Sequence, residues 1–468
     1  MTKIGLEIHC QLTNLESKLF CSCKANYRSF EPNTNICPVC IGLPGSLPRL
    51  NKKAVEKATM IAMSLNCDTP DKLAFFRKNY FYPDLPKNFQ ITQLNVYGEH
   101  SIGQNGKILV DDKEIRIRRI QLEEDPGRLI YEGISEKTQI TLVDYNRAGT
   151  PLVEIVTEPD FENERQVRLF LNILSDLLEN LDVSNPSLDG AMRADGNISI
   201  EGGNKVEIKN VNSFHDLEKA LRFEITRQES LISREIPIDQ ETRHWDDKRK
   251  TTVSARIKEG EEDYRYFLEG DIPWILIDPT TLDKLKNEMP ESISSKKERY
   301  ISKYNIPTQV ADVLSSDKFY SDMFEHAHNE SNVKDIANII TTDLMGLVDT
   351  DEKREKSKLT PQHLADLVDA IETNKITRTS AKTALQECVS TGLSIPEIIS
   401  GMNLGNVGNE SELLKLVAEV FSEEKNAVEE AKTNPQTINF LVGKVMEKTK
   451  GKADPTLTLN IIKKKLAL

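Results

Sequence analysis

The chain has 468 residues and a formal net charge of −13, and charged residues make up 29% of it. This length exceeds one ordinary domain of about 100–200 residues, and the negative charge argues against a protein that coats nucleic acid through its whole surface. No apolar run approaches the roughly 20 residues that cross a bilayer, and the first residues have no apolar signal core. We therefore expect a cytoplasmic protein with no membrane partner.

Residues 1–290 read as short strand-like runs broken by Gly, Pro and Asn, with helical periodicity over residues 52–66 and 162–181. There is no βαβ rhythm. This pattern predicts an α+β domain over residues 1–290 with a mixed, largely antiparallel sheet.

From residue 291 the sequence becomes charged and amphipathic, with Ser, Thr and Pro at expected helix starts. We predict an all-α domain over residues 291–402 and a small helical tail domain over residues 403–468 with three short helices. The Gly- and Asn-rich run 400–411 is typical of a linker.

The strand predicted over residues 4–12 brings Glu7, His9 and Gln11 to one face, because alternate side chains of a strand share a face. A Glu–His pair on a half-exposed edge strand is one interpretation. The other is a divalent-cation site, which requires more ligands from elsewhere in the chain.

Two thiol pairs, Cys21 with Cys23 and Cys37 with Cys40, have spacing that can wrap a tetrahedral ion. Four sulfur ligands leave no open position, so we expect a structural zinc site. Four free thiols are the alternative, since C-x-C is less usual than C-x-x-C.

Three adjacent carboxylates, Glu123, Glu124 and Asp125, end a predicted strand just before a Pro-Gly turn. Like charges this close repel unless a cation or basic residues neutralise them. A solvated acidic loop is the alternative interpretation.

A predicted hairpin places polar side chains on one face of two strands, a floor that suits a charged ligand or, alternatively, a solvated outer face. These side chains belong to Arg193, Asp195, Asn197, Ser199, Glu207, Lys209 and Asn212.

Cations also stand beside aromatic side chains in the run "FFRKNYFYPDLPKNFQITQ", with Arg77, Lys78 and Tyr80. This combination suits a nucleotide or an RNA terminus, although it equally describes a packed surface loop. Arg147, before a Gly-Thr-Pro turn, is a further candidate phosphate ligand. The chain has no P-loop, no G-x-G-x-x-G and no G-x-S-x-G motif, which argues against a P-loop nucleotide site and a covalent hydrolase.

The motifs "GLEIHCQL", "CPVCIGLPGSLPRLN", "RKNYFYPDLPKNFQITQ", "LEEDPGRL", "DYNRAGTPLVEIVTEPD", "MRADGNISI", "EIKNVNSF" and "DYRYF" follow one another between residues 3 and 267. In this order they resemble the B subunit of the tRNA-dependent aspartyl/glutamyl amidotransferase. The resemblance implies a cradle-shaped catalytic domain. It also implies phosphorylation by ATP of the side-chain carboxylate of Glu or Asp on misacylated tRNA, followed by amidation with ammonia.

The resemblance places magnesium at Glu7, His9, Glu124 and Glu207, which are then also the catalytic residues, with Glu123 and Asp195 as further candidate ligands. His9 is an atypical ligand, because magnesium favours oxygen. Zinc would be structural. Candidate residues for ATP or the tRNA terminus are Arg77, Lys78, Asn79, Tyr80, Arg147, Arg193, Asp195, Asn197, Lys209, Asn210 and Asn212.

The partners implied are the glutamine-hydrolysing amidase (the A subunit), the small C subunit, the misacylated tRNA and the non-discriminating aminoacyl-tRNA synthetase. A relative of the archaeal glutamyl-specific amidotransferase E subunit and a non-catalytic tRNA-binding scaffold remain alternatives. The sequence departs from the family after "DYRYF", where it reads "LEGDIPWILID" and keeps only Pro273 of a proline-rich run. It also has Gly196 where a small non-glycine residue is more usual, which should loosen that strand slightly.

Overall fold

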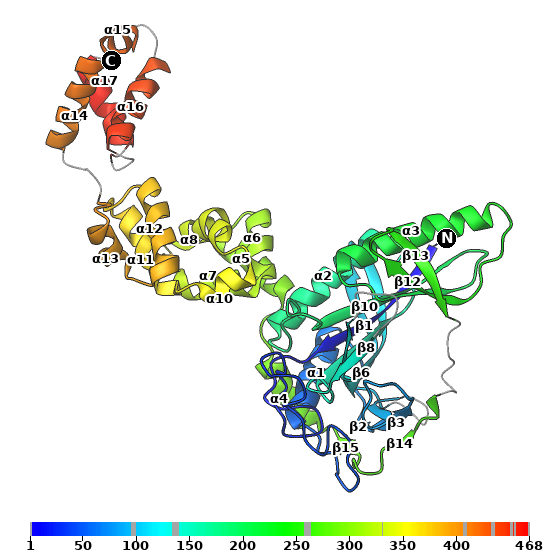
Figure 1. Ribbon diagram of the computed structural model, residues 1–468. Helices are drawn as coiled ribbons and strands as arrows, with labels where there is room; N and C mark the ends of the chain where they lie inside the picture. The colour runs from blue at the N-terminus through cyan, green and yellow to red at the C-terminus, as the bar shows by residue number, and fades with distance from the viewer. Residues whose placement is uncertain are drawn as a thin grey trace. The chain divides into compact units, whose positions relative to one another are not determined.

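The computed structural model describes residues 2–94, 100–132, 140–256, 264–329, 331–405, 410–431, 436–449, 453 and 455–466. It divides into two compact units, Met1–Ser292 and Ile293–Leu468 (Figure 1). Residues 406–409 of the predicted linker lie outside the described residues.

The first unit is built on an eight-stranded sheet with the strand order β13-β12-β11-β10-β1-β9-β6-β5. All neighbouring strands are antiparallel except β11 and β12, which run parallel. The prediction of a mixed, largely antiparallel sheet is therefore confirmed. The strands are β1 (Thr2–Gln11), β5 (Gly103–Val110), β6 (Lys113–Glu124), β9 (Pro151–Thr157), β10 (Met192–Ile200), β11 (Val206–Lys209), β12 (Glu241–Asp246) and β13 (Thr251–Arg256).

Smaller sheets and four α-helices complete the described part of this unit. The three-stranded sheet has the order β14-β3-β4, and two pairs are β15-β2 and β7-β8. The strands are β2 (Lys72–Leu73), β3 (Phe76–Asn79), β4 (Phe89–Thr92), β7 (Arg128–Glu132), β8 (Ile140–Asp144), β14 (Phe267–Leu268) and β15 (Ile275–Leu276). The helices are α1 (Lys52–Ser64), α2 (Glu164–Asn180), α3 (Phe214–Ile232) and α4 (Pro279–Glu288).

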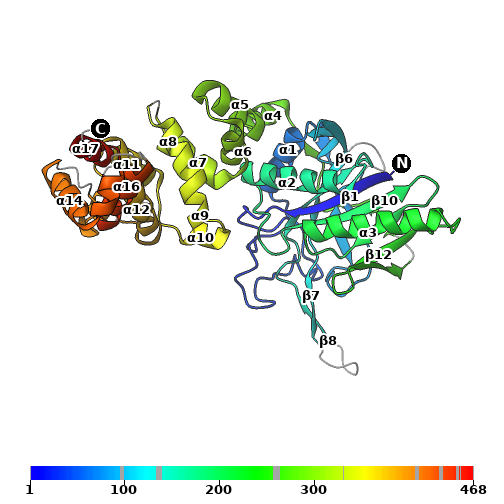
Figure 2. The same ribbon diagram turned by 90° about the horizontal axis from the view of Figure 1, so that it is seen from above.

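Helices α2 and α3 lie along one face of the large sheet, beside β1 and β10 (Figure 2). Leu6, Ile8 and Cys10 of β1 are fully buried in the core that includes Leu174 of α2 and Leu221 of α3. Burial of apolar surface on this face stabilises the unit by roughly 25 cal/mol per Å². The opposite face of β1 is therefore left for polar side chains, as the alternation predicted.

Gly196 on β10 has a packing role against α3. A Cβ atom at Gly196 would lie 3.1 Å from Leu221 Cδ2 and 3.4 Å from Leu217 Cδ1. Glycine at this position lets the helix approach the sheet closely. The expected loosening of the strand is thus accompanied by tighter contact with α3.

The second unit is entirely helical in its described part and holds two separate apolar clusters. One involves residues from Tyr300 to Leu404 and the other from Leu413 to Leu466. The helices of the first part are α5 (Ile293–Tyr304), α6 (Thr308–Ser316), α7 (Lys318–Ala327), α8 (Val333–Ile339), the π-helical turn η2 (Ile340–Leu344), α9 (Met345–Leu347), α10 (Asp351–Lys356), α11 (Pro361–Glu372), α12 (Arg378–Thr391) and α13 (Ile395–Gly401).

The tail contains four described helices where three were predicted. These are α14 (Glu410–Glu423), α15 (Lys425–Ala431), α16 (Gln436–Lys448) and α17 (Pro455–Leu466). The difference arises because the helical stretch is interrupted at Glu424, after which a short helix follows. No helix in the described part of the chain is long and apolar enough to span a membrane.

A turn before β9 joins three parts of the first unit. The Gly149 N–H donates to the Asp125 carbonyl at 2.9 Å, and the Gly149 carbonyl accepts from the Leu19 N–H at 2.9 Å. Gly149 has φ 85°, in the left-handed region that favours glycine. The turn therefore depends on glycine at this position.

We expect Gly149→Ala to lower the free energy of unfolding by about 1–2 kcal/mol, because a Cβ atom is strained at this φ. Chemical denaturation of the full chain measures this. Gly270→Ala is the control, since Gly270 has no positive φ and no atom within 4 Å of its ideal Cβ; it should change stability by less than about 0.5 kcal/mol. Equal stability of the two variants would contradict the argument.

Candidate functional site

The polar face of β1 begins the candidate site. Glu7 and His9 lie side by side there, with Glu7 Oε1 3.8 Å from His9 Nε2. His9 Nε2 also lies 3.8 Å from Glu123 Oε1 at the end of β6. The carboxylate and imidazole of β1 therefore have a further acidic neighbour from another strand.

Glu154 on β9 joins this cluster and was not anticipated from the sequence. It stands directly across from His9 in the antiparallel pair. Ligand atoms of Glu7, His9 and Glu154 all lie within 4.8 Å of one another. A lone carboxylate inside the apolar run "PLVEIV" was the available signal, but identifying its partner required the pairing of β1 with β9.

The crowding of carboxylates changes the acidity of Glu154. Burial, and then the negative charges of Glu123 and Glu7, raise the pKa of Glu154 to about 7. A cation placed among these oxygens would favour ionisation of all three. The donors are carboxylate oxygens with one imidazole, which fits a divalent cation.

Glu124 points away from this cluster. Its carboxylate is paired with Lys87 and accepts the Ile91 N–H at 2.8 Å. Glu123 instead accepts the Thr92 hydroxyl at 2.9 Å. Adjacent residues of a strand face opposite sides, so only one of the two glutamates can face the cavity.

The neighbouring strands β10 and β11 extend the polar floor. Asp195 lies across from Glu7, and Lys209 Nζ lies 3.4 Å from Asp195 and 3.5 Å from Glu207. Glu207 is buried and also accepts the Thr242 hydroxyl at 3.0 Å. The structure thus connects Glu207 to the floor through Lys209, outside the Glu7–His9–Glu154 cluster.

Charge and burial act against each other on the titratable groups of this floor. Burial alone would lower the pKa of Lys209, but Asp195, Glu7 and Glu207 raise it above its ordinary value. Burial raises the pKa of Asp195. Lys209 is therefore held as a cation beside the acidic cluster.

Asp125 organises the arginines. It is fully buried, with Arg193 at 3.1 Å, Arg147 at 3.4 Å and Gln11 Nε2 at 2.5 Å. Burial alone would raise the pKa of Asp125, but the two guanidiniums and the Gln11 hydrogen bond hold it below its ordinary value. Arg193 is the more exposed of the two arginines.

A cavity of about 290 Å³ lies over this floor and has residues of both the large and the three-stranded sheet in its wall. Its lining side chains include more than half of the residues predicted to bind magnesium, ATP or the tRNA terminus. They are Glu7, His9, Lys78, Tyr80, Gln90, Glu123, Asp125, Pro126, Leu152, Arg193, Ala194, Asp195, Lys209, Asn210 and Val211.

Other predicted residues lie outside this lining. Arg77 donates to Glu269 at 2.6 and 2.9 Å and lines a second cavity. Asn79 donates to the Arg265 carbonyl at 2.8 Å. Glu269 belongs to the run after "DYRYF" that departs from the family pattern, so its ion pair with Arg77 helps to fix that loop despite the missing prolines.

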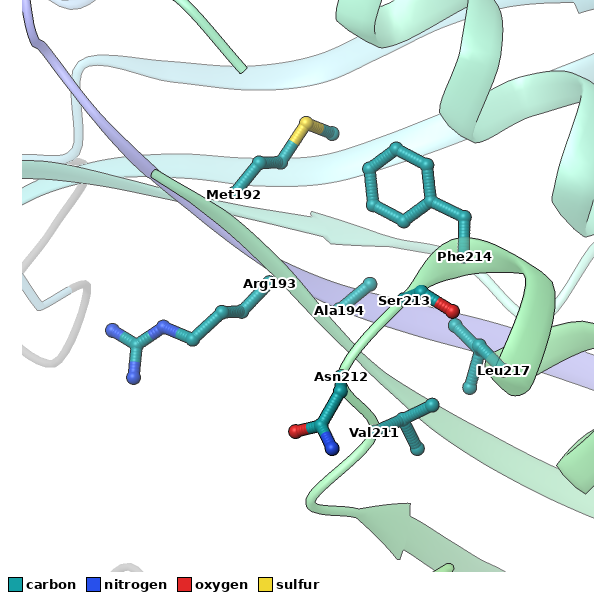
Figure 3. Close-up of a pocket in the computed structure, with 8 residues that line it drawn as sticks. All are labelled: Met192, Arg193, Ala194, Val211, Asn212, Ser213, Phe214 and Leu217. Carbon is teal, nitrogen blue, oxygen red and sulfur yellow. The ribbon is translucent and has the colours of Figure 1, made fainter. Parts of the chain in front are cut away.

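Asn197 and Asn212 are also separate from the cavity lining. Asn197 lies across from Glu207 in the β10–β11 pair. Asn212 lines a hollow of about 10 Å³ at the start of α3. Figure 3 shows Arg193 and Asn212 directed away from the apolar side chains of Met192 and Phe214.

The four predicted zinc ligands come together in the loop between β1 and α1. The Sγ atoms of Cys21, Cys23, Cys37 and Cys40 all lie within 4.8 Å of one another. The Cys21 thiol, and then the Lys18 ammonium, lower the pKa of Cys40. Four sulfur donors at this spacing fit a tetrahedral metal site.

The chain is similar to known proteins over its whole length. Residues 2–283 match the family model of the GatB/GatE catalytic domain, and residues 322–466 match that of the GatB domain. A relative from Sulfolobus acidocaldarius, named as the B subunit of aspartyl/glutamyl-tRNA(Asn/Gln) amidotransferase, is 46% identical over 472 residues and 100% of both chains. The chain belongs to this family of amidotransferase B subunits.

Two further relatives of the same name support the assignment. The Saccharolobus solfataricus protein is 45% identical over 471 residues and 100% of both chains. The Methanospirillum hungatei protein is 41% identical over 481 residues and 99% of both chains. The resemblance inferred from the motifs, and the expectation of an amido-ligase family, are confirmed.

In the metal-free protein, kept so by a chelator, we expect the fold to lose stability as the pH rises. We expect Glu154→Gln to remove this pH-dependent loss. Because folding raises the pKa of Glu154 from 4.5 to about 7, its ionisation destabilises the fold increasingly from about pH 4.5 to pH 7, by up to about 3 kcal/mol. The variant should therefore melt at a higher temperature than the wild type at pH 8, and the two should melt alike near pH 4.

Thermal unfolding in EDTA across this pH range measures the effect. Glu114→Gln is the control, since Glu114 lies on β6 with its side chain 54% exposed. Parallel dependences of the melting temperature on pH for the wild type and Glu154→Gln would show that ionisation of Glu154 does not destabilise the fold.

Proposed function

We propose that the chain uses ATP to phosphorylate the side-chain carboxylate of Glu or Asp on misacylated tRNA, and then amidates it with ammonia. The tRNA amidotransferase role is supported by the names of the full-length relatives. The observation that carries the finer proposal is the cavity whose wall holds the carboxylates Glu7 and Glu123 together with the cations Lys78, Arg193 and Lys209. Glu154 lies next to Glu7 and His9.

Magnesium would be held by Glu7, Glu123 and Glu154, with His9 beside them. When bound, it neutralises charge on the transferring phosphoryl group. The Glu7–His9–Glu154 cluster favours this set, while the family resemblance adds Glu124 and Glu207. His9 touches two of the carboxylates and would fix their orientation even where it does not ligate.

The basic residues have separable roles. Lys78, Arg193 and Lys209 line the cavity and are proposed to hold phosphate oxygens, for which Arg offers two parallel donors. Arg147 is proposed to act indirectly, because it pairs with the buried Asp125 and donates to the Pro126 carbonyl at 2.9 Å. Tyr80, Asn210 and Asp195 complete the wall beside them.

The proposed reaction has two steps, a phosphoryl transfer and an amidation. An oxygen of the substrate carboxylate attacks the γ-phosphorus of ATP, and ADP leaves with the electron pair of the broken P–O bond. Ammonia then attacks the activated acyl carbon, phosphate leaves, and the new amide nitrogen releases a proton to the departing phosphate. Phosphorylation is needed because an unmodified carboxylate has no adequate leaving group.

Ammonia is proposed to arrive through the second cavity, of about 180 Å³. Lys87 and Ile91 line this second cavity. Gln90 lines the larger cavity over the polar floor. Lys87 pairs with Glu124, whose carbonyl accepts from Gln90 at 2.7 Å. We propose that the Lys87–Glu124 pair lies on the route from the second cavity to the first.

The proposed partners are an amidase that releases ammonia from glutamine, a small third protein of the same complex, the misacylated tRNA and the non-discriminating aminoacyl-tRNA synthetase. In the tail, Lys463, Lys464 and Lys465 close to the end of α17 offer partners for tRNA phosphates. Structural zinc is proposed for the four cysteines, and a cytoplasmic location follows from the role in translation.

We expect Glu7→Gln to lower tRNA-dependent ATP hydrolysis by about 10²–10³-fold, because it removes charge from the proposed cation site. The assay uses the chain with its partner proteins, ATP, magnesium and each misacylated tRNA. Glu114→Gln should retain wild-type turnover. Normal turnover by Glu7→Gln would contradict the catalytic proposal and favour a non-catalytic tRNA-binding scaffold.

We expect Lys87→Met to lower glutamine-dependent amidation by about tenfold relative to amidation with ammonium chloride. The reason is that Lys87 stands between the proposed ammonia route and the cavity, whereas free ammonia reaches the cavity from solvent. Lys107→Met is the control, since Lys107 is exposed and pairs with Glu114. An equal loss with both nitrogen sources would rule out the route.

A further inference from the structure

Lys18 is a fully buried lysine beside the four-cysteine site. Its side chain is 0% exposed. Its Nζ donates to the Asn35 carbonyl at 3.0 Å and lies 3.7 Å from Cys40 Sγ. Within the described residues the ammonium forms no ion pair with a carboxylate, so a thiol sulfur is the only acidic group that it contacts.

The charge of Lys18 requires an anion nearby. A buried ammonium costs several kcal/mol of free energy unless it is paired. A divalent ion with four thiolates carries a net charge of −2. If the cysteines are deprotonated and hold a metal, the ammonium of Lys18 has an anionic partner and offsets one of its two negative charges.

We propose that Lys18 is the charge-compensating residue of the four-cysteine metal site and that it increases the retention of the metal. The inference depends on metal binding by the cysteines and not on the proposed reaction. Residues outside the ligand set commonly tune metal affinity by hydrogen bonding to the ligands.

The surrounding backbone holds Lys18 in place for this role. The Lys18 N–H donates to the Cys23 carbonyl at 2.8 Å. The Asn35 side chain bonds the Lys24 backbone at 2.9 and 3.2 Å, and the Asn35 N–H donates to Asn146 Oδ1 at 2.8 Å. The carbonyl that accepts from the ammonium is thus fixed from two sides.

The same lysine lies between the cysteines and the turn at Gly149. A Cβ atom at Gly149 would lie 3.5 Å from Cys40 Cβ, 3.6 Å from Lys18 Cδ and 3.9 Å from Glu124 Oε2. The stem of Lys18 therefore packs in a space bordered by the thiol site and by a glutamate of the proposed ammonia route.

The experiment compares Lys18→Met with Lys24→Met in the full chain loaded with zinc. Methionine keeps the length of the buried stem and removes the charge. Lys24 follows Cys23 and is exposed, so its substitution removes the same charge from the same loop. Zinc release to a chromophoric chelator should be about 10–100-fold more extensive at equilibrium for Lys18→Met, and unchanged for Lys24→Met. Wild-type zinc retention by Lys18→Met would overturn the proposal.

A second comparison separates charge from packing. Lys18→Met is combined with Cys37→Ser and Cys40→Ser, which remove two of the four sulfur ligands. In that background the substitution should leave the melting temperature unchanged or raise it, whereas in the zinc-loaded chain it should lower it. A similar fall in both backgrounds, or failure to fold in both, would assign Lys18 a packing role and overturn the proposal.

Discussion

One constraint governs the polar face of the first unit. Several carboxylates share one face of a sheet, and their mutual repulsion must be offset. Glu7, Glu123 and Glu154 meet around His9, and burial together with the negative charges of Glu123 and Glu7 raises the pKa of Glu154. The cations lie around this group instead of inside it. A site of this kind is prepared for a positive ligand before the ligand arrives.

The arrangement of cations follows from the same constraint. Asp125 is buried between two arginines, and Lys209 stands between Asp195 and Glu207. Each cation is thereby held at a fixed distance from the acidic cluster and is prevented from collapsing onto it. Phosphate oxygens entering the cavity would then meet preorganised positive charge without removing the partners of the metal site.

The sequence predicted those features that depend on local pattern. Alternation along β1 placed Glu7 and His9 on one face, and the spacing of the thiols indicated the four-cysteine cluster. Helix α2 starts after Asn163, which caps it by accepting the Gln166 N–H, close to the predicted start. These signals are contained within a few neighbouring residues.

The rest depended on pairing between distant strands. Glu154 lies 145 residues beyond His9 in the chain, and nothing local indicates that β9 stands beside β1. The motif "LEED" could not reveal which glutamate faces the cavity, because this depends on the phase of β6. The interruption at Glu424 that gives the tail its fourth described helix likewise lacks a proline or glycine marker.

The placement of the cluster on paired strands has a consequence for how the family can diversify. A strand that is hydrogen-bonded on both sides, as β1 is to β9 and β10, inverts its two faces when it gains or loses a residue, unless a β-bulge absorbs the change as one does between Ile117 and Arg119 of β6. A one-residue deletion before Glu7 would turn Leu6 and Ile8 toward the cavity and send the charged side chains into the apolar core. Changes of length are therefore better tolerated in the hairpins, loops and bulges, while the residues around Glu7 in the middle of the sheet vary most easily by exchange of one side chain for another.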